Sequence, residues 1–107
     1  MRITDLLAKE SISLNRTLKT KNEAIDALIE LHEKAGNLGD KAAYKKSILE
    51  RESQSSTAVG DGIAIPHAKT AAVKKPGLSA MTVPSGVDYD ALDGKKTDLF
   101  FMIAAPE

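Results

Sequence analysis

His67 is the residue of this sequence best suited to covalent chemistry, and it follows the short apolar segment Ile63–Ile65 and a proline. Neutral imidazole is a good nucleophile at physiological pH because its unperturbed pKa is about 6.5. A phosphoryl group on an imidazole nitrogen is reactive enough to be passed on. For this transfer the protein mainly has to position the reacting groups and supply hydrogen-bond donors to the charged phosphoryl oxygens. His67 is therefore the candidate carrier of a phosphoryl group.

The residues that precede this histidine could supply those donors. Gly60 and Gly62 permit close backbone approach and exposed N–H groups. Ser56 and Thr57 add hydroxyl groups, and Arg51 offers a planar guanidinium that is always charged. Serines and glycines also occur in solvated turns, and an arginine often makes only a surface ion pair. We predict that these five residues surround the phosphoryl group.

The sequence gives little support to other kinds of site. No histidine pair at i, i+4 and no cluster of histidine with carboxylates lies near His67, so we predict no metal site and no cofactor. The pair Lys74–Lys75 is too short to be a nucleic-acid patch. His32 is spaced from Leu28 at the margin of an apolar helix face, and we expect it to pack there without a functional role.

Length and composition indicate one globular domain over residues 1–107. Apolar residues make up 42% of the chain, and 15 basic residues balance 15 acidic ones, so no overall field favours nucleic acid or anionic lipid. There is no cysteine, which excludes disulfides and thiol chemistry and is typical of a cytoplasmic protein. No apolar run reaches the roughly 18 residues that span a bilayer.

Capping residues and periodicity predict two helices. Thr20 and Glu23 have capping-box spacing, and apolar residues then recur at helical intervals as far as Gly36. Asp40 is a suitable N-cap for a second helix that ends at about residue 52 and delivers Arg51 to the following loop. The other expected elements are helical turns at 3–7 and 71–73, strands at 11–14, 63–65, 78–83, 87–89 and 98–105, an irregular loop at 53–62 and a turn at 93–94.

These elements favour an α/β fold in which a mixed β-sheet is flanked by helices on both faces. The segment Leu99–Ala105 is continuously apolar, as in strands that are buried on both faces. Few elements remain to cover it. We therefore expect the chain to be incomplete at its carboxyl end, or to bury this strand against a second copy.

The segment Gly60–Ala68, with Glu52 upstream, resembles the signature of enzyme IIA domains of the phosphotransferase system, of the fructose and mannitol type (type 2). Val87–Gly94 and Phe101–Glu107 also resemble segments of that family, so the likeness extends over essentially the whole chain. The ending His67–Thr70 resembles the fructose members more closely than the mannitol members. The resemblance implies a mixed sheet with helices on both sides.

The resemblance also implies partners. In that family the histidine equivalent to His67 is phosphorylated on Nε2 by the phosphocarrier protein HPr and passes the group to a cysteine of a IIB domain. Contact with the membrane is then only through a fused or associated IIC component. Family members carry a second active-site histidine beyond the segment equivalent to Ala104–Pro106, and this sequence reaches Glu107 without one. We expect such a chain to expose apolar surface or to self-associate.

Two alternatives stay open. The first is a nitrogen-regulatory relative that keeps the phosphorylated histidine and acts by binding other proteins according to its phosphorylation state. A fused IIB and IIC downstream would favour transport, and a separate gene would favour regulation. The second is a binding or structural domain in which His67 only hydrogen-bonds a carbonyl at the end of a strand.

Overall fold

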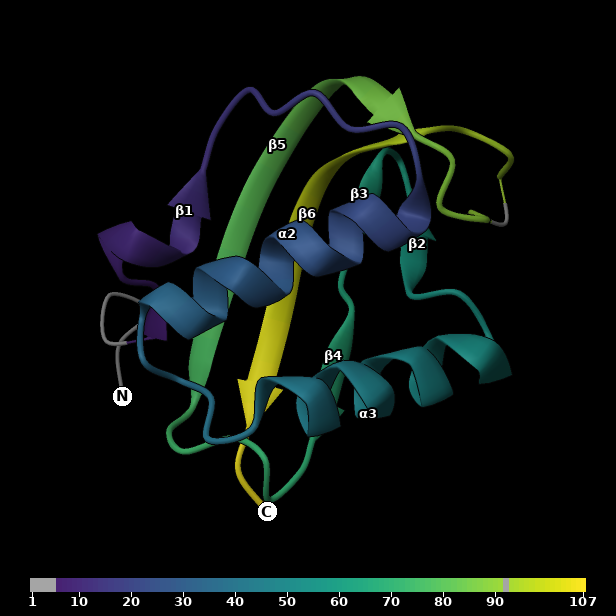
Figure 1. Ribbon diagram of the computed structural model, residues 1–107. Coiled ribbons are helices and arrows are strands. Elements are labelled where there is room, and N and C mark those ends of the chain that lie inside the picture. Colours follow the sequence, from purple (N-terminus) through teal and green to yellow (C-terminus); the bar gives the residue numbers. More distant parts are fainter. Residues whose placement is uncertain (1–5, 92) are drawn as a thin grey trace.

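In the described residues the fold is a six-stranded mixed sheet with the α-helices α2 and α3 lying across it (Figure 1). The computed structural model describes residues 6–91 and 93–107, so residues 3–5 of the expected first helical turn lie outside the described part. The described elements, in chain order, are the 3-10 helix η1 (Lys9–Ser11), β1 (Ile12–Ser13), α2 (Lys21–Lys34), α3 (Lys41–Gln54), β2 (Ala58–Gly60), β3 (Ile63–Ala64), β4 (His67–Lys69), β5 (Gly77–Val87) and β6 (Thr97–Ala105).

Most of the sheet is bonded to β6. This strand pairs antiparallel with β5 on one side and parallel with β3 and then β4 on the other. β1 pairs parallel with β5, and β2 pairs antiparallel with β3, which gives the order β1-β5-β6-β3-β2 with β4 also beside β6. The prediction of a mixed sheet is confirmed.

Both helices lie over the same face of the sheet (Figure 1). α2 packs on β5 and α3 packs on β4, and the helices are joined by the ion pairs Lys41–Glu30 and Lys45–Asp26, the latter with an Nζ–Oδ1 distance of 2.8 Å. In the described residues the expectation of helices on both faces is thus met on one face only. The largest fully buried apolar side chains of the core are Ile25, Leu28, Ile29, Tyr44, Ile48, Met81, Val83, Val87, Tyr89, Phe100 and Met102.

The two faces of β6 differ in burial. Phe100, Met102 and Ala104 face the helices and are buried. Phe101 is half-buried, and Ile103 is 38% exposed. No helix in residues 6–91 or 93–107 covers the second face, which agrees with the expectation that few elements of the chain remain to cover this strand. Self-association through this face stays a prediction.

The expected helix caps are confirmed. The Thr20 hydroxyl accepts the Glu23 N–H, and the Glu23 carboxylate accepts the Thr20 N–H, so the capping box is complete. The Asp40 carboxylate accepts the Ala43 N–H at 3.1 Å and caps α3. α3 continues to Gln54, two residues beyond the predicted end at residue 52.

Several strand predictions need correction. The loop at 53–62 contains β2, which forms because Ala58 pairs with Ala64. Pro84 does not end β5, since the strand continues to Val87. The β5–β6 register shifts between Thr82 and Val87, so the missing proline N–H interrupts a ladder that is already irregular. The separate edge strand predicted at 87–89 is not formed, because Val87 is the last residue of β5 and residues 88 and 89 are not in a strand.

The segment 71–73 is a turn and not a helical turn. The Val73 N–H bonds to the Thr70 carbonyl at 3.1 Å, and Val73 then forms an isolated antiparallel bridge with Leu38. Because this bridge joins segments 35 residues apart, local periodicity gave no sign of it.

His32 is fully buried against the sheet. Its Nε2 lies 3.0 Å from the Met102 carbonyl, and its Nδ1 lies 3.0 Å from the Asn37 side-chain nitrogen. Since a carbonyl only accepts, Nε2 carries the proton and Nδ1 accepts from the Asn37 amide. Burial lowers the pKa of His32 to about 4, partly offset by the Met102 bond. The predicted packing role is confirmed.

We expect His32 to make the free energy of unfolding depend on pH. The folded protein holds the ring neutral down to about pH 4, whereas the unfolded chain binds a proton below about pH 6.5. Stability is therefore complete above pH 6.5 and falls as the pH drops toward 4, by about 3 kcal/mol in total. Urea unfolding followed by circular dichroism at several pH values measures this loss. His32→Gln should show a shallower dependence over that range, and equal slopes would contradict the assignment.

Candidate functional site

His67 is exposed and begins β4, where it pairs with Ile103 of β6. The expectation that it lies just past a strand end is half right, because β3 ends at Ala64 and a second short strand starts at His67 itself. Pro66 lies between the two strands and its carbonyl accepts the Ile103 N–H at 3.0 Å. Backbone hydrogen bonds at Pro66 and the pairing of β4 therefore fix His67 beside the central strand β6.

The ring of His67 is held in one orientation by its own backbone. Nδ1 lies 2.8 Å from the Ile65 carbonyl oxygen. Since that oxygen can only accept, Nδ1 carries the hydrogen of the neutral ring, and the lone pair is on Nε2. Among the described residues Nε2 has no hydrogen-bond partner, so it is the atom available to attack phosphorus.

Two shallow hollows lie beside His67, and Arg51 lines both of them. One is polar, has a volume of about 300 Å³, and is lined by Ser47, Glu50, Arg51, Gln54, His67, Ala68 and Lys69. The other is more apolar, has a volume of about 330 Å³, and is lined by Arg51, Ser56, Thr57, Val59, Ile65, His67 and Ile103. Arg51 and His67 therefore line the same two hollows, and a role for Arg51 at the histidine stays a prediction.

Arg51 is half-buried in the last part of α3. Its Nη1 donates to the Ser55 carbonyl at 3.2 Å and lies 3.5 Å from the Ser55 hydroxyl oxygen. A guanidinium has five N–H donors, so this contact leaves others for a ligand between Arg51 and His67.

The hydroxyl groups of Ser56 and Thr57 line the apolar hollow but already donate within the protein. Ser56 donates to the Tyr89 carbonyl at 2.6 Å, and Thr57 donates to the Glu52 carboxylate. The Thr57 and Ala58 N–H groups are also used, by the Glu52 carboxylate and by the Ser56 hydroxyl oxygen. In this geometry Ser56 and Thr57 shape the hollow, and contact with a phosphoryl group would require these bonds to break.

Gly60 and Gly62 do not lie beside His67. The turn that contains them adjoins the Ile63–Leu99 pair, whereas His67 pairs with Ile103, about 13 Å further along β6 at 3.3 Å per residue. The prediction that these glycines donate to a phosphoryl group on His67 is therefore wrong for this structure. Both glycines instead allow the backbone conformation of the turn. Gly60 has φ of 98° and Gly62 has φ of 80°, values that favour glycine.

The turn between β2 and β3 is stabilised by hydrogen bonds to Asp93, an acidic residue much later in the chain. The Asp93 carboxylate accepts the N–H groups of Lys95 at 3.0 Å and of Asp61 at 3.1 Å, which together lower the pKa of Asp93. Gly94 donates its N–H to Ala91, in agreement with the turn predicted at 93–94.

Two apolar residues near the histidine were not among the predicted site residues. Val59 is 66% exposed and Ile103 is 38% exposed, and both line the apolar hollow. The sequence carried one signal for Val59, namely an apolar residue within a segment of hydroxyls and glycines. Nothing local marked Ile103, because its position depends on the pairing of β4 with β6.

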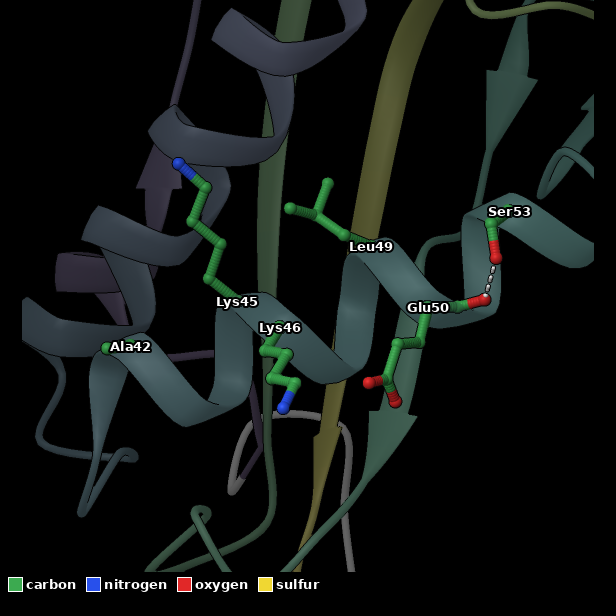
Figure 2. Close-up of a pocket in the computed structure, with 6 residues that line it drawn as sticks. All are labelled: Ala42, Lys45, Lys46, Leu49, Glu50 and Ser53. Atoms are coloured by element: carbon green, nitrogen blue, oxygen red, sulfur yellow. Dashed lines mark hydrogen bonds between the residues drawn. The ribbon is translucent and has the colours of Figure 1, made fainter.

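A larger groove, of about 490 Å³, runs along the outer side of α3 and is lined by Ala42, Lys45, Lys46, Leu49, Glu50 and Ser53 (Figure 2). The Ser53 hydroxyl donates to the Glu50 carbonyl at 2.6 Å, and Lys45 pairs with Asp26 of α2. Neither a histidine nor an arginine lines this groove. The described residues contain no group of three His, Cys, Asp or Glu side chains that could hold a metal ion.

Comparison with known proteins places the chain in a family. Residues 5–107 match the family described as phosphoenolpyruvate-dependent sugar phosphotransferase system, EIIA 2. The chain belongs to this family. It is 53% identical over 107 residues to the fructose-specific EIIABC component of Bacillus subtilis, covering all of the chain and 17% of that relative. It is 43% identical over 104 residues to a fructose-specific EIIA component of Haloferax volcanii, covering 97% of the chain and 68% of the relative.

Solved structures of EIIA proteins share the fold. The nitrogen regulatory protein IIA-Ntr of Neisseria meningitidis superposes with a TM-score of 0.88 at 30% identity, covering 98% of this chain and 71% of that one. The mannitol IIA enzyme of Escherichia coli, solved in a complex with phosphorylated IIB, superposes with a TM-score of 0.82 at 30% identity, covering 94% and 72%. The EIIA resemblance read from the sequence is thereby confirmed.

We expect Gly62→Ala to destabilise the fold without removing the chemistry of His67. An added Cβ would lie 2.7 Å from Asp98 Oδ1, and φ at this position is 80°. These two effects together should reduce the free energy of unfolding by about 2 kcal/mol, measured by urea unfolding. Gly94→Ala is the matched control, because φ is 71° there but nothing lies within 4 Å, so its loss should be smaller. Equal losses would show that the Asp98 contact does not matter.

Proposed function

We propose that this EIIA chain is a phosphocarrier in which His67 accepts a phosphoryl group from phospho-HPr and passes it to a cysteine of a IIB domain. The observation that carries the proposal is the bond between His67 Nδ1–H and the Ile65 carbonyl, which leaves the Nε2 lone pair free on an exposed ring. Family membership supports the general role, since EIIA proteins are components of the phosphotransferase system.

The two transfers balance without a cofactor. In the first, the Nε2 lone pair attacks the phosphorus of the donor phosphohistidine, a P–Nε2 bond forms, and the electrons of the broken P–N bond return to the donor ring. In the second, a thiolate attacks the same phosphorus, and the electrons of the P–Nε2 bond return to His67. Because Nδ1 keeps its proton throughout, the ring needs no tautomer change between the steps.

Arg51 is proposed to stabilise the charge of the transferred group. It lines both hollows beside His67, and within residues 6–91 and 93–107 its side chain hydrogen-bonds only to Ser55, so its remaining donors can meet the equatorial phosphoryl oxygens. The second active-site histidine implied by the family resemblance is not His32, which is buried against Met102. Lys69 lines only the polar hollow, whereas Arg51 is the cation among the described residues that lines both hollows beside His67.

The relatives support IIB as acceptor and fructose-type uptake as the setting. The Bacillus subtilis relative is a fructose-specific EIIABC component, and the Escherichia coli structure contains a IIA enzyme with phosphorylated IIB. No helix in residues 6–91 and 93–107 is long and apolar enough to cross a membrane. We infer a cytoplasmic site of action, with the membrane reached through a fused or associated IIC component that selects the sugar.

A regulatory role is the second candidate. The structure of the nitrogen regulatory protein from Neisseria meningitidis supports it, and a nitrogen regulatory protein of Bradyrhizobium diazoefficiens is 35% identical over 108 residues, covering 100% of the chain and 69% of that protein. Such a role would use the same phosphorylated histidine with other partners. Transfer from the phosphorylated chain to a IIB cysteine favours transport, and retention of the phosphate in its presence favours regulation.

We expect incubation with phosphoenolpyruvate, enzyme I and HPr to place one acid-labile phosphate on the chain, detected by intact-protein mass spectrometry. His67→Ala should abolish it, because the nucleophilic Nε2 is removed, while His32→Gln should retain it, since His32 is buried. Labelling that persists in His67→Ala contradicts the assignment. Failure to label the unmodified chain would favour an inert domain.

We expect Arg51→Ala to lower the rate of phosphoryl transfer to His67 by about 10- to 100-fold, because a charged donor to the transferred group is lost. The free energy of unfolding should change by only about 0.5 kcal/mol, since the one hydrogen-bond partner of the side chain in the described part of the chain is Ser55. Arg51→Lys is the matched control: it keeps the charge but not the planar fork, so its rate should be intermediate. Unchanged quench-flow kinetics in Arg51→Ala would refute the role.

A further inference from the structure

Glu52 is an acidic side chain that points into the protein one residue after Arg51. Only 4% of its side chain is exposed. A buried carboxylate is costly unless a charge and hydrogen bonds compensate it. Lys21, in the first turn of α2, supplies the charge, with its Nζ 3.0 Å from Glu52 Oε1.

The hydrogen bonds come from the segment that enters β2. Both donors of Thr57 are directed at Glu52: its N–H bonds to Oε1 at 3.3 Å and its hydroxyl bonds to Oε2. Thr57 is itself buried and lines the apolar hollow beside His67. One carboxylate therefore joins the start of α2 and the end of α3 to the wall of the candidate site.

Tyr89 closes this cluster from a third direction. Its ring is fully buried with the Lys21 ammonium 4.6 Å from the ring centroid, and its carbonyl accepts the Ser56 hydroxyl. Burial, followed by the nearby Glu52 carboxylate, raises the pKa of Tyr89 well above its ordinary value. The hydroxyl has no hydrogen bond of good geometry in residues 6–91 and 93–107, so Tyr89 contacts the ion pair through its ring face, over which the Lys21 ammonium lies.

We propose that Glu52 is a positioning residue for the phosphoryl-accepting site, and this deepens the function proposed for His67. Successive side chains on a helix are 100° apart, so directing Glu52 into the Lys21 and Thr57 cluster directs Arg51 toward the hollows that contain His67. The same carboxylate holds the Thr57 wall of the apolar hollow. Glu52 acts through Arg51 and Thr57 and does not line either hollow with His67.

The first test is Glu52→Gln, which keeps the shape of the side chain and removes its charge. We expect the rate of transfer from saturating phospho-HPr to fall about tenfold with little change in KM, because the donors are misplaced while docking is retained. Lys45→Met is the matched control, since Lys45 forms the exposed α2–α3 ion pair with Asp26 and lies outside both hollows beside His67. It should transfer at the unmodified rate.

A double-mutant cycle separates positioning from general loss of structure. If Glu52 acts partly through Arg51, then Glu52→Gln should lower the rate by a smaller factor in an Arg51→Ala background than in the unmodified chain, and the loss that remains is the part that acts through Thr57. Full additivity, or an unmodified rate in folded Glu52→Gln, overturns the proposal. If Glu52→Gln fails to fold, Thr57→Val carries the test, because it removes the hydroxyl bond and leaves the Lys21–Glu52 pair in place. Its rate should also fall, and an unmodified rate overturns the proposal.

A readout without phosphoryl transfer keeps this inference distinct from the proposed function. If the unmodified chain accepts no phosphate, the function of His67 fails. Amide hydrogen exchange at Thr57 and the NMR resonance of Arg51 Nε–H then decide the role of Glu52. Faster Thr57 exchange, by about tenfold, and a shifted Arg51 resonance in Glu52→Gln support positioning, and unchanged spectra overturn it.

Discussion

The backbone ladder of β6 is the constraint on which the site depends. β6 is paired over its length, with β5 on one side and with β3 and then β4 on the other. His67 enters the site as the first residue of β4, opposite Ile103, and the Pro66 carbonyl holds the Ile103 N–H. Any slip of β4 by one residue would turn the histidine to the opposite face of the sheet.

The proline before the histidine explains how the ring is oriented. It separates β3 from β4, so the Ile65 carbonyl lies in a gap between two strands and accepts the ring Nδ1–H of His67. The Ile65 N–H bonds to the Thr57 carbonyl, and among the described residues no backbone N–H uses the Ile65 carbonyl, so this oxygen is available to the ring. The result is a nucleophilic nitrogen whose tautomer is set by the main chain and not by a neighbouring carboxylate.

Two buried polar clusters join the helices to the sheet, one through neutral hydrogen bonds and the other through an ion pair. His32 is kept neutral and is satisfied by a carbonyl and an amide, so it binds α2 to β6 without a charge. Glu52 is paired with Lys21 and bonded to Thr57, so it ties both helices to the wall of the site. A neutral cluster loses stability in acid, whereas an ion pair is costly mainly when one partner is removed.

By itself, the sequence determined the features that depend on residues within a few positions of one another. The caps at Thr20 and Asp40 and the segment that identifies the family around His67 are of this kind, because caps, turns and a signature depend on near neighbours. Only the tertiary structure decided that Gly60 and Gly62 serve a turn away from the histidine and that both helices cover one face. These outcomes depend on which strands pair across long distances in the chain. Local periodicity does not determine the order of strands in a sheet.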